Sequence, residues 1–147
     1  MAKAKAKPSI EIEQPDTIEG CGDVIWRALQ YTAYREDIGD DKKPNAQAIE
    51  RKKRELLDLQ ALCQERVTMM LAKTPQDACI QLAMLGGEID LVEADGMTEH
   101  ELRRVHRKIT RMLFSLMRWI EAEHGVARHR VCEHYLNSDC DPWSVAN

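Results

Sequence analysis

Apolar residues recur at helical spacing over the second half of the chain. They occupy the two seam positions of consecutive heptads, which is the pattern of an amphipathic helix. Thr98 and Glu101 form a capping box, and Gly125 is placed to end the helix in the left-handed conformation. The pattern therefore predicts a long helix over 99–124. Its apolar seam consists of Leu102, Val105, Ile109, Met112, Leu116 and Trp119.

Two earlier segments also carry a helical pattern. Over 45–73, apolar residues recur every seven positions from Ile49 to Met70, and they predict a second long helix. Before that segment, Asp23 is placed to accept hydrogen bonds from the free N–H groups of a first helical turn. We expect this first helix to run to about Ile38.

The clearest local signal for a helix start lies in the middle of the chain. Thr74 is placed as an N-cap, Pro75 stands where its missing N–H costs nothing, and Asp77 lies in the positive first turn. These residues predict a helix over 75–94. Gly86-Gly87 interrupts its pattern and predicts a kink or a break. The first of these glycines lies on the apolar side, where a neighbouring helix is expected to approach its backbone.

Together with a shorter helix or irregular segment over 126–136, these elements predict an all-α protein. We expect four to five helices joined by short loops, arranged as an antiparallel bundle or an orthogonal helical array. The Lys/Ala-rich stretch 1–15 is expected to be a disordered basic tail, and 16–147 to be a single helical domain. Helices of this length, about 40 Å, often protrude or pair with a second subunit, so self-association through 99–124 stays open.

The composition excludes several classes of protein. Aromatic residues make up only 5% of the chain, and with seven Gly and five Pro the signature of an all-β fold is missing. No apolar run approaches the length of a membrane span, so no membrane partner is expected. The five cysteines are odd in number and scattered, which predicts reduced thiols in the cytoplasm. A net charge of −4 leaves any affinity for nucleic acid to a local patch.

Such a patch lies opposite the apolar seam of 99–124. At about 100° per residue, six cations and one aromatic residue fall on one arc of this helix. Cations neutralise acidic groups, and an aromatic ring offers a stacking surface. The alternative is a solvated face whose arginines pair with Glu99, Glu101 and Glu121. The residues of this basic face are Arg103, Arg104, Arg107, Lys108, Arg111, Phe114 and Arg118, with Arg103, Arg107, Arg111 and Arg118 expected to dominate its field.

A cluster of histidines and cysteines near the C-terminus suggests a possible metal site. If 126–136 is helical, His129 and Cys132 lie one turn apart on the same face and offer two ligands, and His124 and Cys140 complete a tetrahedral set. The spacing matches no known zinc module, and a histidine also suits the negative end of a helix. No metal is therefore favoured, and a metal site is kept as an alternative.

A second cysteine environment precedes the expected start of the first helix. Gly20 and Gly22 flank Cys21, and a thiol at a positive helix end has a lowered pKa, as nucleophilic cysteines do. The carboxylate of Asp23 disfavours the thiolate. The sequence therefore favours a flexible glycine-rich turn over 19–23.

These patterns together predict a small, non-enzymatic helical interaction or adaptor protein. No acid, base and nucleophile can be placed in one pocket, and no cofactor is expected. The basic face is expected to bind an acidic protein partner, with self-association of the chain. Two alternatives stay open: a nucleic-acid-binding regulatory protein that uses the same face, and a metal-binding module built on the C-terminal cluster.

Overall fold

The computed structural model describes residues 15–38, 46–92, 96–128 and 130–144, and within these ranges the chain is all-α, as predicted. The tail predicted for residues 1–15 lies, apart from Pro15, outside the described residues. The helices are α1 (Ile18–Ile38), α2 (Ala46–Thr68), α3 (Pro75–Val92), α4 (Glu99–His124) and α5 (Arg130–Tyr135), followed by the short 3-10 helix η2 (Ser138–Cys140).

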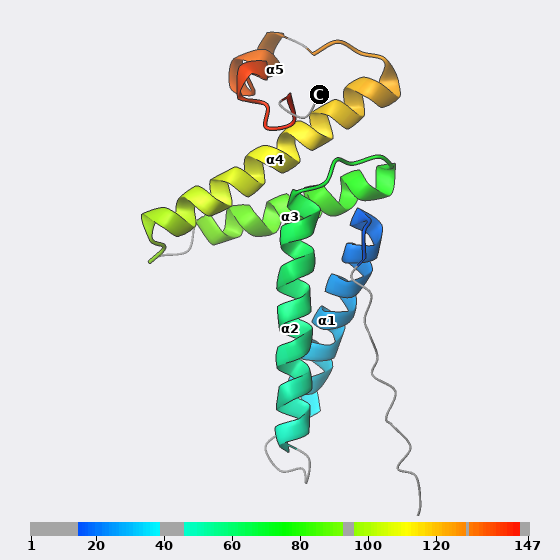
Figure 1. Cartoon of the computed structure of the whole chain (residues 1–147), viewed down its shortest axis with the longest axis vertical. Coiled ribbons are helices and arrows are strands. Elements are labelled where there is room, and N and C mark those ends of the chain that lie inside the picture. Colours follow the sequence, from blue (N-terminus) through cyan, green and yellow to red (C-terminus); the bar gives the residue numbers. More distant parts are fainter. Residues whose placement is uncertain (1–14, 39–45, 93–95, 129, 145–147) are drawn as a thin grey trace, which may run out of the picture.

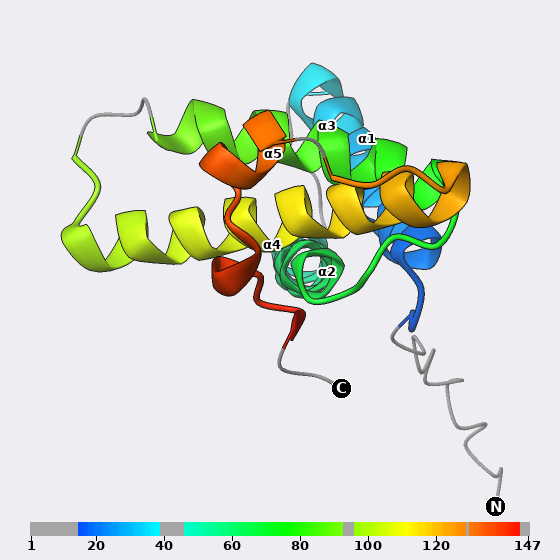
Figure 2. The same cartoon turned by 90° about the horizontal axis from the view of Figure 1, so that it is seen from above.

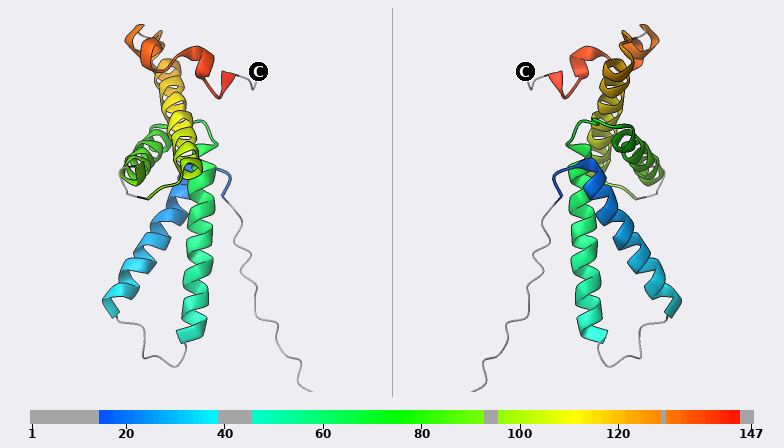
Figure 3. Two further views of the ribbon diagram at one scale, coloured as in Figure 1. Left: turned by 90° about the vertical axis from the view of Figure 1, so that its left-hand side faces the viewer. Right: turned by 90° about the vertical axis from the view of Figure 1, so that its right-hand side faces the viewer.

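The helices form two antiparallel hairpins that cross each other. Helices α1 and α2 make one hairpin, and α3 and α4 lie across one end of it (Figure 1). From above, α2 is seen end-on while α3 and α4 run alongside each other (Figure 2). Away from this junction α1 and α2 diverge (Figure 3). The arrangement is therefore an orthogonal array, one of the two architectures that the pattern allowed.

Helix α1 begins at Ile18, so its predicted start at Asp23 is wrong. Thr17 provides the cap, since its hydroxyl oxygen accepts a hydrogen bond of 3.1 Å from the Gly20 N–H. Ile18 and Cys21 are buried in the core that joins α1 to α2. Their burial stabilises a helical conformation of residues 19–23, which were expected to form a glycine-rich turn.

The C-terminus of α2 is capped by a side chain from α3. The buried amide of Gln81 donates hydrogen bonds to the carbonyl oxygens of Val67, at 3.0 Å, and Met70, at 2.8 Å. Val67 lies in the last turn of α2 and Met70 just beyond it, where carbonyls have no helical N–H four residues on. Helix α2 therefore ends at Thr68, before the predicted end at Lys73.

Helix α3 begins as predicted. The Thr74 hydroxyl oxygen accepts a hydrogen bond of 3.0 Å from the Asp77 N–H, and the Asp77 carboxylate accepts one of 3.2 Å from the Thr74 N–H. Of the kink or break predicted at Gly86-Gly87, the break is wrong, since α3 continues through both residues to Val92. The close approach expected at Gly86 is also absent from the described residues: a Cβ added there would meet nothing within 4 Å.

Helix α4 has its predicted bounds. Both hydrogen bonds of the Thr98 and Glu101 capping box are present, and Gly125 ends the helix with φ 60° and ψ 29°. In the described part of the chain, no helix has the length and apolar character needed to cross a membrane.

Candidate functional site

The C-terminal half of the predicted basic face is covered by the chain that follows α4. This C-terminal segment, residues 126–144, returns along the helix. Phe114 is only 1% exposed, and the guanidinium of Arg128 lies 5.6 Å from the centre of its ring. The prediction that Phe114 offers a stacking surface is therefore wrong in this fold, because the ring packs inside the molecule.

The C-terminal segment also pairs with the cation of Arg118 and contacts the main chain of Arg111. Arg118 Nε donates a hydrogen bond of 2.8 Å to Asp141 Oδ2, and the Asp141 side chain is buried. The indole N–H of Trp143 donates a hydrogen bond of 3.1 Å to the main-chain oxygen of Arg111. This end of the basic face is therefore an internal contact.

Two further cations join α4 to the other helices. Arg104 lies 3.0 Å from Glu65 of α2, and Lys108 lies 3.0 Å from Glu88 of α3 and 3.6 Å from Glu65. Burial of the Glu65 carboxylate raises its pKa, but the two cations more than offset this, so the pKa of Glu65 lies below its ordinary value. Arg104 and Lys108 thus hold the two hairpins together.

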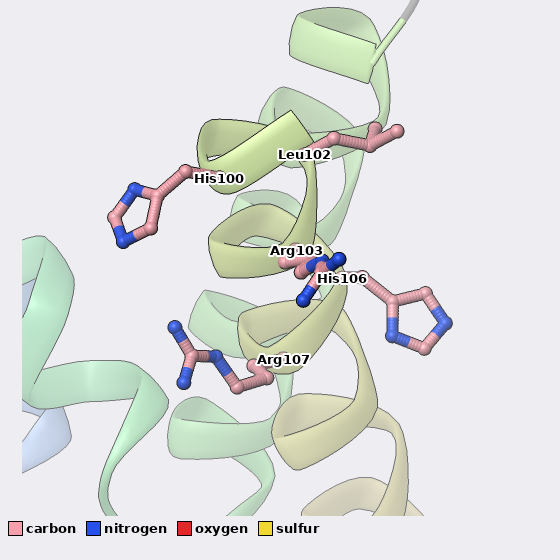
Figure 4. A pocket seen from close by; sticks show the side chains of 5 residues that line it. All are labelled: His100, Leu102, Arg103, His106 and Arg107. Atoms are coloured by element: carbon pink, nitrogen blue, oxygen red, sulfur yellow. The ribbon is translucent and has the colours of Figure 1, made fainter. Parts of the chain in front are cut away.

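What remains open is the first half of the face, near the start of α4. Among the described residues, Arg103 pairs only with Glu99, one turn away, and both side chains are exposed. Arg107 is exposed and makes no ion pair with any described residue. With His100, His106 and Leu102, these arginines line an open hollow of about 580 Å³, in which His100 and His106 point to different sides of the helix (Figure 4). Because the described residues that line this hollow all belong to α4, it is an open surface and not an enclosed pocket.

An apolar groove continues from this hollow. It lies between the C-terminal end of α3 and the N-terminal half of α4 and has a volume of about 370 Å³. Leu102 and His106 line both the groove and the hollow. Ile89, Val92 and Leu102 are each between 43% and 49% exposed. This end of the α3–α4 hairpin extends past α1 and α2 (Figure 1), so no other described helix covers it. We call the combined area the α3–α4 surface: His100, Arg103, His106 and Arg107 on its basic side, and Ile89, Val92, Leu102 and Ile109 on its apolar side.

Sequence reasoning missed part of this surface. The apolar pattern predicts a buried seam that includes Leu102 and Ile109, and it indicates no role for His100 and His106. An apolar seam shows which side of a helix seeks burial, but it does not show where the neighbouring helix ends. The spacing of His100 and Arg103, three positions apart, is the one local signal, and it places the imidazole of His100 beside the basic side.

The candidate metal ligands are not assembled in the described residues. His124 is exposed at the end of α4, its ring 6.2 Å from that of Trp119, while Cys132 is half-buried on α5 and Cys140 is exposed on η2. His129 lies outside the described residues. Among those that are described, no three His, Cys, Asp or Glu side chains lie close enough together to hold an ion.

Cys21 lies in the core and not at an exposed helix end. Its thiol is fully buried against that of Cys63, and burial, followed by the proximity of Cys63, raises the pKa of Cys21 to about 11. A raised pKa suppresses the thiolate, which is the nucleophilic form. The environment of Cys21 is therefore the opposite of that of a reactive cysteine.

Comparisons with known proteins add no family and no relative to these observations. No protein-family model matches the chain, and no curated protein or solved structure shows significant similarity to it.

Proposed function

We propose that this chain is a non-enzymatic helical interaction protein that binds an acidic, amphipathic protein segment through its α3–α4 surface. The observation that carries the proposal is the continuity of the basic hollow with the apolar groove through Leu102 and His106. An amphipathic helix lays apolar side chains into a groove and uses charges at the edge to set its orientation. Both features lie side by side here.

The apolar groove favours a protein partner over nucleic acid. A phosphate backbone offers no apolar side chains to fill a space lined by Ile89, Val92 and Leu102. Burial of Phe114 also removes the aromatic ring on which a base would stack. Arg107 makes no ion pair with a described residue, and the pair of Arg103 with Glu99 is exposed to solvent, so both arginines can meet carboxylates of a partner. Arginine is also enriched at protein interfaces. We place this function in the cytoplasm, where free thiols such as the five of this chain stay reduced.

A binding experiment with a designed probe tests the proposal. The probe is a fluorescent helical peptide with leucine on one face and glutamate on the others, and its binding is followed by fluorescence anisotropy. We expect the double variant Arg103→Glu/Arg107→Glu, and separately Leu102→Asp, to weaken binding about tenfold or more. The matched control is Arg51→Glu, which changes an exposed cation on α2 and should leave binding unchanged.

Two further titrations separate the alternatives. The same peptide with lysine in place of glutamate should bind far more weakly, because its positive charges repel the arginines of the α3–α4 surface. A DNA duplex at low salt is the second ligand. Binding of the duplex without the acidic peptide, with an affinity that falls steeply with salt, would replace this proposal with a nucleic-acid function.

A further inference from the structure

A second apolar groove lies between α1 and α3, on the far side of α3 from the α3–α4 surface. It measures about 350 Å³, and Trp26 and Leu29 of α1 and Ile80 and Met84 of α3 are among its lining residues. Trp26 is 60% exposed and Leu29 48%. A large, exposed aromatic side chain beside a hollow is typical of the residues that dominate protein interfaces.

The rim of this α1–α3 groove is acidic. Glu19 and Asp23 line it from α1, and both are exposed. Neither makes an ion pair with a described residue. The groove therefore combines an apolar floor with two unpaired carboxylates. The α3–α4 surface combines an apolar groove with the arginines Arg103 and Arg107, so the two surfaces of one chain are complementary in charge and alike in apolar character.

The two surfaces can be occupied at the same time. Ile80 lines the α1–α3 groove and Ile89 lines the α3–α4 surface. These residues are nine positions apart on α3, which at about 100° per residue places them on opposite sides of the helix. A contact that joins two different patches of one chain is heterologous, so it can continue from one copy to the next.

We propose that copies of this chain associate head to tail, with the α3–α4 surface of one copy bound in the α1–α3 groove of the next. The inference rests on the proposed function, because it names the acidic partner of that surface as a second copy. Trp26 and Leu29 of one copy meet the apolar side of the α3–α4 surface. Glu19 and Asp23 meet Arg103 and Arg107.

Sedimentation velocity on the full chain and two surface variants tests this. The first variant, Arg103→Glu/Arg107→Glu, alters the α3–α4 surface, and the second, Trp26→Glu/Leu29→Glu, alters the groove. For the wild type we expect a mass that rises with concentration, and for each variant alone a monomer, with association weakened about tenfold or more. An equimolar mixture of the two variants should form a one-to-one dimer, because only one intact surface of each kind remains.

A charge exchange provides the internal control. Adding Glu19→Lys/Asp23→Lys to the Arg103→Glu/Arg107→Glu chain reverses both sides of the contact and should restore association. Circular dichroism and thermal unfolding of each variant establish that it is folded, and all the altered side chains are exposed. A monomeric wild type at every concentration, or a variant mixture that gives no heterodimer, overturns the inference.

The same samples keep the two proposals apart. A monomeric wild type that still binds the acidic probe peptide retains the proposed function and refutes self-association. Association that persists unchanged in both variants refutes the head-to-tail contact. If the acidic peptide does not bind but the variants and the charge exchange behave as expected, the surface serves self-association alone, and the broader proposed function fails.

Discussion

At the scale of single residues, the same residue type has opposite roles at different places in this fold. Gly22 stands where α1 approaches α3, and a Cβ added there would lie 2.8 Å from Cδ1 of Ile80. Gly87 lies inside α3 with nothing within 4 Å of an added Cβ. Both glycines carry the entropic cost of a flexible backbone. Only Gly22 allows a close approach of two helices in return.

Alanine at these two positions should therefore change stability in opposite directions. Gly87→Ala is expected to raise the free energy of unfolding by about 0.5 to 1 kcal/mol, since alanine favours the helix and meets no neighbour. Gly22→Ala is expected to lower it by about 1 kcal/mol, because Ile80 must move. Urea unfolding at low protein concentration measures both. An equal gain at both positions would show that the contact with Ile80 costs nothing.

The buried thiol of Cys21 makes stability depend on pH in the alkaline range. In the unfolded chain the thiol ionises near its ordinary pKa of 9.0, whereas the folded thiol keeps its proton up to about 11. The folded state thus binds the proton more tightly, so its stability is fully present below pH 9 and is lost as pH rises toward 11. The slope contributed is at most about 1.4 kcal/mol per pH unit.

Comparison with Cys21→Ala isolates this contribution from other groups that titrate in the same range. We expect the free energy of unfolding of the wild type to fall more steeply than that of the variant between about pH 9 and 11, as measured by urea titrations at several pH values. Cys63, whose pKa burial also raises, remains in both proteins. If the free energies of unfolding of the two proteins fell in parallel with pH, the pH dependence could not be assigned to Cys21.

At the scale of elements, the helices are joined through ion pairs that α4 makes with both of its neighbours. Lys108 is the central group, since its amine contacts Glu88 of α3 and Glu65 of α2. The Glu88 side chain is only 8% exposed, and one of its carboxylate oxygens has no hydrogen-bond partner in the described residues. Loss of the lysine would leave a buried charge without compensation.

Lys108→Met should therefore lower the free energy of unfolding by about 3 kcal/mol, and adding Glu88→Leu should recover most of that loss. Arg103→Met is the matched control, since its exposed pair with Glu99 is expected to contribute less than about 0.5 kcal/mol. Chemical unfolding of the wild type and these three variants measures the loss and its recovery. A loss for Lys108→Met no larger than that of the control would show that the Lys108–Glu88 pair does not stabilise the packing of α4 on α3.

At the scale of the whole molecule, the C-terminal segment determines how much of α4 is exposed to solvent. It buries Phe114 and pairs Asp141 with Arg118, while Trp143 is tied to the Arg111 carbonyl. The far end of the same helix receives no such cover and keeps Arg103 and Arg107 open. One amphipathic helix is thereby divided into a half that packs inside the fold and a half whose arginines stay exposed.

Trp143→Ala should release the C-terminal segment without unfolding the two hairpins. We expect amide protection of residues 130–140 to fall about tenfold while that of α2 is retained, as measured by hydrogen exchange. Tyr135→Ala provides the control, because Tyr135 is an aromatic residue of the same segment that is 78% exposed. Equal effects of the two substitutions would refute a specific anchoring role for Trp143.

Local signals in the sequence determined the all-α class and the helix ends that depend on near neighbours. Thr74 with Asp77, and Thr98 with Glu101, act across three residues, so both starts could be read directly. Such caps need no information from the rest of the chain.

Tertiary structure alone decided which cations stay open, and it adds to the local cap of Thr17 the burial that stabilises the start of α1. Ile18 is buried against α2, and the pairs of Arg104 with Glu65 and Lys108 with Glu88 join residues 39 and 20 positions apart. Phe114 lies on the side of α4 that the pattern indicated, yet it is buried by a segment that returns from the C-terminus. Periodicity reports which side of a helix a residue occupies, whereas burial and ion pairing depend on distant segments that share no local pattern with it.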